Sequence, residues 1–361
     1  MSQPENPKRV VVRGTNWVGD AVMTIPALRA LRKLLPSAHI TLATRSFARG
    51  IFEGADFLDE LLVHDKPAGT LSDSIGQSKE WRGHDFDLAI LFTNSFGSAL
   101  IARMARVRCR VGYATESRGF LLTHPVPVPS WRATRHESFY YLNLVSELES
   151  LLLGKSDLLS DPVDNELRVP ANRLAEAKAF LQKQGVRGER PLIALCPGSI
   201  NSRAKRWPAE RYAVLGDRLR TELDADVILI GSSAELDVSI EVSERMKTKP
   251  IMLTGKTDLA QVVAILGQAD LLITNDTGPA HIGAALGRPT LVIFGPTNPL
   301  TTSPMSPVAE ILRVPPDCAP CMLRDCPIDH RCMTAISPEM VFERAVKMMP
   351  YVTQTVSLRT T

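Results

Sequence analysis

Strand-sized apolar runs alternate with helix-sized amphipathic stretches along most of the chain, and this alternation constrains the fold more than any other feature. We expect strands at 10–13, 39–43, 60–64, 87–92 and 109–112, and then at 191–196, 226–231, 250–253, 270–274 and 290–294. In the second half, helices are expected near 171–184, 208–223, 233–247, 258–267 and 278–286. Such alternation is typical of a parallel sheet covered by helices. The sequence predicts an α/β protein with two doubly wound parallel sheets.

A polar stretch with two prolines, "DLLSDPVDNELRVPANR" at 157–173, interrupts this alternation and is typical of a linker. The chain has 361 residues, which is long for one hydrophobic core. We therefore expect an N-terminal domain over 1–165 and a C-terminal domain over 166–335. A last helix near 338–349 is expected within a terminal segment, 336–361.

Composition excludes several classes of protein. Hydrophobic residues make up 44% and charged residues 22% of the chain, as in ordinary globular proteins. The apolar runs are far shorter than the roughly 20 residues of a membrane span. Because "MSQPENPKR" at the N-terminus is polar and unlike a signal peptide, we expect a cytoplasmic protein. The net charge of +3 gives no reason to expect nucleic acid as a partner.

Arginine is concentrated in the segment from Ile101 to Arg135. This segment contains a single acidic residue, Glu116. The segment predicts a local anion-binding face. Its arginines are Arg103, Arg106, Arg108, Arg110, Arg118, Arg132 and Arg135.

Ligands of doubly wound sheets bind at the carboxyl ends of the strands, so the loops there are the candidate sites. The first such loop, "GTNWVGDAVM" at 14–23, has two glycines and places Asp20 where a helix begins. Asp20 is either a helix cap or a carboxylate that acts on a substrate. Gly14 and Gly19 would allow a close approach to a ligand.

Three loops of the second half carry polar groups suited to phosphate. "CPGSINSRAKRWP" at 196–208 combines Ser199 and Lys205 with a Pro-Gly turn, although a solvated basic loop would look the same. In "ITNDTGPAHIGAALG" at 273–287, Asp276, Thr277 and Gly278 precede a helix whose N-terminus could bind phosphate, or they simply cap it.

Glu235, in "ILIGSSAELD" at 228–237, could accept hydrogen bonds from a ribose or only favour the helix dipole. None of these loops matches G-x-G-x-x-G or a Walker loop, which disfavours dehydrogenases and P-loop enzymes.

Four segments together resemble the ADP-heptose:lipopolysaccharide heptosyltransferases of glycosyltransferase family nine. They are "GTNWVGDAVMTIPALRALRK", "CPGSINSRAKRWP", "NDTGPAHIGAALGRPTLVIFGPTNP" and "CAPC…CP…CM", in the family's order. The resemblance implies a GT-B fold, in which two Rossmann-like domains face each other across a cleft. The "AKRWP" segment is most similar to the subtype that adds the second heptose of the inner core. Subtypes I and III, an epimerase of the same fold and a non-catalytic nucleotide-sugar-binding protein are the alternatives.

The resemblance also implies roles for particular residues. Asp20 matches the family's general base and Lys205 the lysine that stabilises the diphosphate. The positions that match its donor-binding residues are Ser199, Glu235, Asp276, Thr277 and Gly278. An inverting transfer from ADP-heptose to a lipid-anchored inner-core acceptor would need no metal for catalysis.

Because inner-core acceptors are anionic, we expect an arginine, Arg118, to bind the acceptor. The expected location is the cytoplasmic face of the inner membrane, with at most peripheral attachment and no stable protein partner.

Four of the six cysteines fall within a short segment, at Cys318, Cys321, Cys326 and Cys332. In a cytosolic protein this spacing favours a structural zinc site over disulfides. Reduced thiols or a reversible disulfide are the alternatives.

Overall fold

A computed structural model describes residues 7–65 and 71–349 of the chain, which divides into two compact units, Met1–Asn165 and Glu166–Thr361. The end of the predicted terminal segment, 350–361, lies outside the described residues. The stretch 154–170 contains no helix or strand, and it overlaps the predicted linker, 157–173, except for its last three residues, which begin a helix.

The first unit contains a six-stranded parallel sheet in the order β3-β2-β1-β4-β5-β6. The strands are β1 (Arg9–Arg13), β2 (His39–Thr44), β3 (Glu60–Val63), β4 (Leu88–Leu91), β5 (Cys109–Tyr113) and β6 (His124–Val126). The α-helices are α1 (Val18–Met23), α2 (Ile25–Leu34), α3 (Arg49–Phe52), α4 (Leu71–Gly83), α5 (Phe96–Met104) and α6 (Glu137–Leu153). Short 3-10 helices are η1 (Ser46–Ala48), η2 (Gly119–Leu121) and η3 (Ser130–Ala133).

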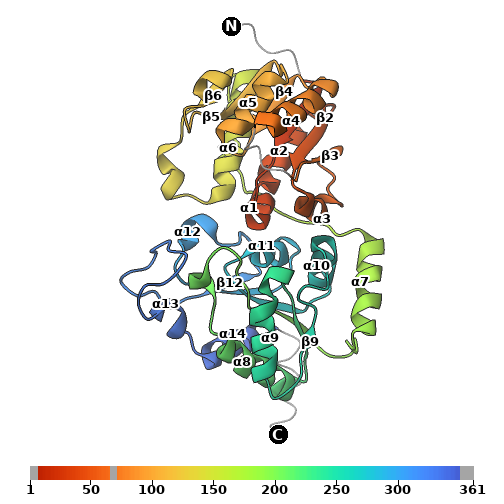
Figure 1. The fold of residues 1–361 in the computed structure, drawn as a ribbon, viewed down its shortest axis with the longest axis vertical. Helices are drawn as coiled ribbons and strands as arrows, with labels where there is room; N and C mark the ends of the chain where they lie inside the picture. Colours follow the sequence, from red (N-terminus) through yellow and green to blue (C-terminus); the bar gives the residue numbers. More distant parts are fainter. Residues whose placement is uncertain (1–6, 66–70, 350–361) are drawn as a thin grey trace. The chain divides into compact units, whose positions relative to one another are not determined.

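Two helical layers form in this unit, because α2 packs on α6 while α4 packs on α5 (Figure 1). The central strands β1 and β4 are almost entirely buried, as expected for a sheet covered on both faces. In α2, Leu28 and Leu31 are buried and follow the apolar stripe of the sequence. Pro26 lies in the first turn of α2, so it opens this helix after α1 has ended.

The second unit contains another six-stranded parallel sheet, in the order β12-β11-β10-β7-β8-β9. The strands are β7 (Leu192–Cys196), β8 (Asp226–Leu229), β9 (Ile251–Met252), β10 (Leu271–Asn275), β11 (Thr290–Ile293) and β12 (Ala309–Leu312). The α-helices are α7 (Ala171–Lys183), α8 (Ala209–Glu222), α9 (Leu236–Arg245), α10 (Leu259–Leu266), α11 (Gly278–Ala285), α12 (Pro299–Thr302), α13 (Arg331–Thr334) and α14 (Pro338–Met348), with the 3-10 helices η4 (Arg203–Lys205) and η5 (Ser233–Glu235).

The final helix α14 is an integral part of the second unit. It packs on α8, which also contacts α9 (Figure 1). Val341, Phe342 and Ala345 of α14 join the core cluster built on β7, β8, β10 and β11. On the other side, α10 packs against both α7 and α11.

The predicted doubly wound α/β fold is confirmed, and two edge strands were missed. β6 contains only His124, Pro125 and Val126, and proline is tolerated in a sheet only at an edge or a bulge. β12 is half-exposed and has the sequence "AEIL", which lacks an apolar run. Both strands lie at sheet edges, where partial exposure removes the hydrophobic signal.

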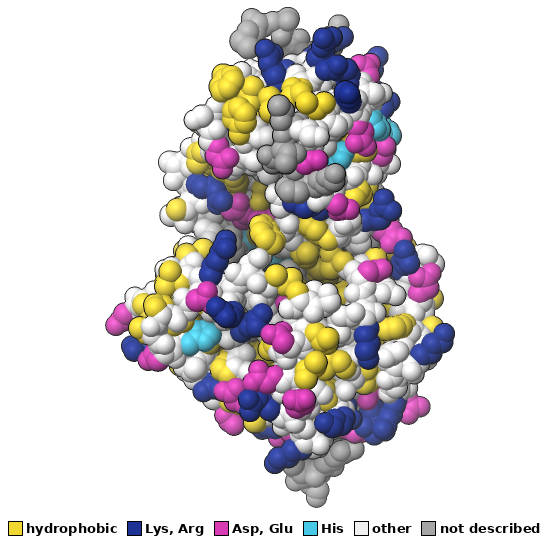
Figure 2. Space-filling model, in the orientation of Figure 1, with side chains coloured by type: hydrophobic (Ala, Val, Ile, Leu, Met, Phe, Trp, Pro, Cys, Tyr) yellow, Lys and Arg dark blue, Asp and Glu magenta, His cyan; other side chains and the backbone are white. Residues whose placement is uncertain are grey.

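Acidic and basic side chains are interspersed on the surface of each unit (Figure 2). Within the described residues, no helix combines the length and the hydropathy that crossing a membrane requires.

Candidate active site

The sheet order of the second unit brings together the loops that the sequence singled out. β7 is the first strand of this sheet along the chain, and it lies between β8 and β10. The strands β8 and β9 follow on one side of it and β10, β11 and β12 on the other, so the strand order reverses between β7 and β10. Ligands of doubly wound sheets bind at such a reversal, beyond the carboxyl ends of the strands. Lys205 follows β7 and Asp276 follows β10, so both residues lie at the predicted place.

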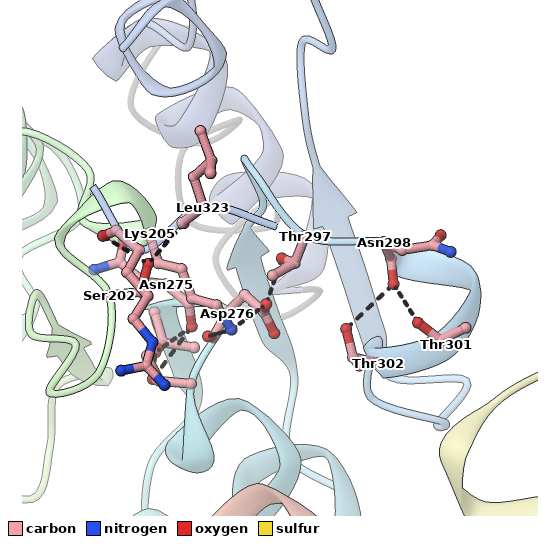
Figure 3. A network of polar contacts seen from close by, with 12 residues as sticks. Ser202, Lys205, Asn275, Asp276, Thr297, Asn298, Thr301, Thr302 and Leu323 are labelled. Carbon is pink, nitrogen blue, oxygen red and sulfur yellow. Dashed lines mark hydrogen bonds and ion pairs between the residues drawn. The ribbon is translucent and has the colours of Figure 1, made fainter. Parts of the chain in front are cut away.

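Lys205 and Asp276 form an ion pair there, shown in Figure 3. The Lys205 ammonium lies 2.8 Å from Asp276 Oδ2 and donates a hydrogen bond to the Asp276 carbonyl at 3.1 Å. Thr297, after β11, donates a hydrogen bond to the same Oδ2 at 2.6 Å. Asp276 is only 3% exposed, so these partners compensate a carboxylate that has lost its water. Since an ammonium has three N–H donors, Lys205 can hold Asp276 and still donate to a ligand.

Asn275 fixes the basic loop to the end of β10. Its side-chain amide nitrogen donates to the carbonyls of Pro197 and Gly198, at 2.8 and 3.2 Å. Its Oδ1 accepts from the Trp207 backbone N–H and from the Tyr212 hydroxyl, each at 3.1 Å. Because Asn275 is fully buried, these hydrogen bonds hold both ends of the loop in a defined position.

The N-terminus of α11 points into the same region. Thr277 is the N-cap residue, but its hydroxyl lies near Thr274 Oγ1 and the Asn275 carbonyl and makes no capping hydrogen bond. Gly278 is the first helical residue, and Pro279, which follows it, has no N–H. The first-turn N–H groups and the helix dipole favour an anion at this end.

Glu235 and Ser199 are both buried beside this region. Glu235 Oε2 accepts hydrogen bonds from the Ser232 backbone N–H, at 2.9 Å, and from its hydroxyl, at 2.8 Å, which forms a capping box. The Ser199 carbonyl accepts from the Arg206 guanidinium at 3.0 and 3.2 Å. A Cβ at Gly198 would lie 2.2 Å from Glu235 Oε1, so this glycine lets the loops after β7 and β8 meet.

The first unit has an equivalent reversal between β1 and β4. Thr93, after β4, donates a hydrogen bond to the Gly14 carbonyl at 2.6 Å, which ties the two strand ends together. A Cβ at Gly14 would lie 3.2 Å from side-chain atoms of Leu42 and Thr44, so the glycine allows close packing against β2.

Asp20 lies in the first turn of α1, whose N-cap residue is Trp17. The interpretation of Asp20 as a helix cap is therefore wrong. Asp20 is partly exposed, and its Oδ1 accepts a hydrogen bond from the Tyr141 hydroxyl at 3.1 Å.

Arg118 differs from its expected place on an acceptor-binding surface, because it is fully buried. Its guanidinium donates to the Tyr113 and Ser95 carbonyls, to Ser98 Oγ and to Asn94 Oδ1 at 2.9–3.2 Å, and also to the Thr93 carbonyl. Burial lowers the pKa of Arg118 to about 10, so the side chain stays charged at neutral pH. Arg118 thus supports the loop after β4 from within.

The other arginines of this segment do not share one exposed face. Arg110 is buried and donates to the Leu121 and Val107 carbonyls. Arg132 is paired with Glu137, and Arg135 lies over the rings of Trp131 and Phe139. The exposed members are Arg103, Arg106 and Arg108.

The four clustered cysteines are free thiols, of which Cys318 is exposed and Cys332 buried. Burial and the neighbouring Cys321, Cys326 and Cys318 raise the pKa of Cys332 to about 11, so the four lie in one neighbourhood. Among the described residues, which include all four, no group of three or more His, Cys, Asp or Glu side chains is arranged to hold a metal ion. Zinc binding by these cysteines stays a prediction.

The sequence interpretation missed Thr297 and Tyr141. Thr297 was within a recognised segment, and its position after β11, next to β10, could have identified it. Tyr141 is 121 residues from Asp20, and no local spacing connects the two.

The comparisons with known proteins agree with this architecture. The sequence model of "Glycosyltransferase family 9 (heptosyltransferase)" matches residues 77–331. The chain is 30% identical to lipooligosaccharide heptosyltransferase 2 of Haemophilus ducreyi, over 73% of this chain and 76% of that protein. It is 29% identical to lipopolysaccharide heptosyltransferase 2 of Escherichia coli, over 85% and 88%. The solved structure of E. coli ADP-heptose LPS heptosyltransferase II matches with a TM-score of 0.81 and 26% identity, covering 94% of this chain and 98% of that one.

The two doubly wound units have the GT-B fold, and the family match makes the protein a glycosyltransferase. The chain belongs to glycosyltransferase family 9.

The close contact between Gly198 and Glu235 generates a test of how the site is held. Gly198→Ala should force the Glu235 carboxylate away from its capping box and lower the melting temperature by about 2–4 °C, equivalent to about 1 kcal/mol. In a Glu235→Ala background the same change should cost little, because the clashing atoms are gone. Gly76→Ala, where a Cβ meets nothing within 4 Å, is the matched control. Equal losses in both backgrounds would contradict the contact.

Proposed function

We propose that this protein transfers heptose from ADP-heptose, with inversion, to a lipid-linked inner-core acceptor that already carries one heptose. The names of the relatives support the donor, the acceptor class and the second-heptose subtype. The observation that carries the proposal is the Lys205–Asp276 pair beside the N-terminus of α11, at the strand reversal of the second unit. The ammonium of Lys205 and the N–H groups at this helix end are donors suited to a diphosphate.

In the proposed reaction, an acceptor hydroxyl attacks the anomeric carbon while the bond from that carbon to the ADP oxygen breaks. Asp20 takes the proton of the attacking hydroxyl as general base. The negative charge that develops on the departing diphosphate is stabilised by Lys205 and by the N–H groups of Thr277 and Gly278. In this scheme the protein's own groups supply the positive charge, without a catalytic metal.

Ser199 and Glu235 complete the proposed donor site. Glu235 sits after β8, next to the strand that leads to Lys205, where a carboxylate can accept hydrogen bonds from a ribose. Its capping bonds use Oε2, and Oε1 faces Gly198. Ser199 lies in the Pro-Gly turn and contributes to the phosphate side. Asp276 acts through Lys205, which it orients.

Replacing the proposed base tests the chemical step. Asp20→Asn should lower kcat by about 10³-fold or more, because an amide cannot accept the proton, while ADP-heptose binding stays within about twofold. ADP release measured with acceptors that carry or lack the first heptose reports turnover and subtype together, and calorimetry reports donor binding. Full turnover in Asp20→Asn would remove Asp20 from the mechanism, and preference for the acceptor without heptose would overturn the subtype.

Lys205 has two roles to separate, since it also compensates the buried Asp276. Lys205→Met should weaken donor binding and lower kcat, each by at least about tenfold. The double variant Lys205→Met with Asp276→Asn removes both charges and should recover most of the lost stability, but not the activity. If the double variant regained full activity, the lysine would serve only to neutralise Asp276.

Peripheral attachment to the membrane is part of the proposal. Phe120 is 74% exposed and packs on the half-exposed ring of Phe96, with ring centroids 6.2 Å apart. Such a pair in the acceptor-binding unit is suited to a lipid surface.

Phe120→Ser should lower binding to anionic lipid vesicles by about tenfold, because a Phe side chain contributes roughly 1.5–3 kcal/mol when buried. Sedimentation with vesicles measures this. Leu153→Ser, which changes a 66% exposed side chain at the end of α6, is the control and should have no effect. Unchanged binding of Phe120→Ser would contradict this contact.

A further inference from the structure

Two side chains of α6, one helical turn apart, reach the region of Asp20. Tyr141 is 5% exposed and donates a hydrogen bond from its hydroxyl to Asp20 Oδ1 at 3.1 Å. Glu137 is 8% exposed and binds Arg132 of η3 with both oxygens, at 2.8 Å to Nη2 and 2.5 Å to Nη1. The sequence analysis assigned a role to neither residue.

The electrostatics connect the three groups. Burial raises the pKa of Glu137, and the charge of Asp20 adds to this, while the Arg132 guanidinium acts in the opposite direction. Burial and the charges of Asp20 and Glu137 raise the pKa of Tyr141 well above its usual value, against a smaller effect of Arg132. The phenol therefore stays protonated and donates its hydrogen to Asp20, while the charge of Glu137 acts on the same hydroxyl.

The surroundings fix the position of this hydroxyl. The Tyr141 ring contacts Phe92, with centroids 5.4 Å apart. The ring of the neighbouring Tyr140 stacks on the ring of Tyr113, with centroids 4.0 Å apart. The Arg132 guanidinium carbon lies 4.1 Å from the centroid of the Tyr140 ring. α6 also packs along α2. This packing holds the Tyr141 hydroxyl in a defined position, as a positioning residue requires.

We propose that Tyr141 is a positioning residue for the general base: its hydroxyl holds the ionised Asp20 in one orientation, beside the negative charge of Glu137. The inference rests on the proposed role of Asp20. Before the transfer, the ionised Asp20 accepts the hydrogen bond and is held in one orientation. No bond of Tyr141 breaks.

The pH dependence of kcat/KM tests this, because its acidic limb reports the base of the free enzyme. Tyr141→Phe removes a donor to the ionised base and should move the acidic limb to higher pH by about half to one unit. Glu137→Gln removes a neighbouring negative charge and should move the limb to lower pH. Tyr141→Phe should also lower kcat about tenfold while both KM values stay within about twofold. Opposite shifts are not expected from loss of structure alone.

Tyr113→Phe is the matched control. Its buried hydroxyl also bonds to α6, because it donates to the Tyr140 carbonyl at 2.7 Å and accepts from the Asn143 side chain. It does not contact Asp20. This variant should melt at a lower temperature with an unmoved pH profile.

The Asp20→Asn variant separates the two proposals. If it keeps full turnover, Asp20 is not the base, and both the base assignment and this inference fail. Suppose instead that Asp20→Asn is inactive. If Tyr141→Phe then keeps the acidic limb of the wild-type pH profile, or shows only a lower melting temperature as Tyr113→Phe does, the role of Tyr141 alone is overturned. Shifts of Tyr141→Phe and Glu137→Gln in the same direction would overturn the opposite effects assigned here to the hydroxyl donor and to the neighbouring charge.

Discussion

The buried carboxylate of Asp276 is the constraint on which the second unit depends. A carboxylate that is 3% exposed destabilises the fold unless cations and donors compensate it. Lys205 and Thr297 provide this from the loops after β7 and β11, so neutralising one charge fixes the positions of three strand-end loops. The same requirement places an ammonium at the N-terminus of α11. A stabilising contact and a phosphate-binding feature thus arise from one arrangement.

Rigid packing beneath this pair keeps the loops in place. Asn275 uses its amide nitrogen and its oxygen to hold the loop after β7, and Trp207 closes that loop with a fully buried ring. The Trp207 indole N–H donates to the Ile336 carbonyl at 3.0 Å, which connects the loop to the start of α14. Because Asn275 and Trp207 are fully buried, the loop costs little further ordering when a ligand binds. The terminal helix therefore contributes to the site indirectly.

Sequence patterns predicted those parts of the molecule that depend on local chemistry. The central strands appear as apolar runs because both faces are covered, and the loops after β1, β7 and β10 carry the charges that the strand-end rule led us to examine. The pattern did not predict β6 and β12, whose edge positions remove the apolar signal. It assigned Arg118 to acceptor binding because guanidinium groups suit anions, whereas carbonyls from two segments, the loop after β4 and the end of β5, bind it inside the protein. Tyr141 was missed because its contact with Asp20 depends on how α6 packs beside α1.

The partners of the two aspartates explain why they are suited to different tasks. Protonation of Asp276 would abolish its attraction to Lys205 and leave an ammonium without its counter-charge, so this carboxylate is suited to holding a cation in place. Asp20 instead accepts a hydrogen bond from a neutral phenol, the Tyr141 hydroxyl, and is partly exposed, so this contact does not depend on a charged partner. Arg132 is held by both oxygens of Glu137. A base must lose its charge during the reaction, whereas a group that orients a cation must keep its charge, and the contacts of each aspartate match one of these requirements.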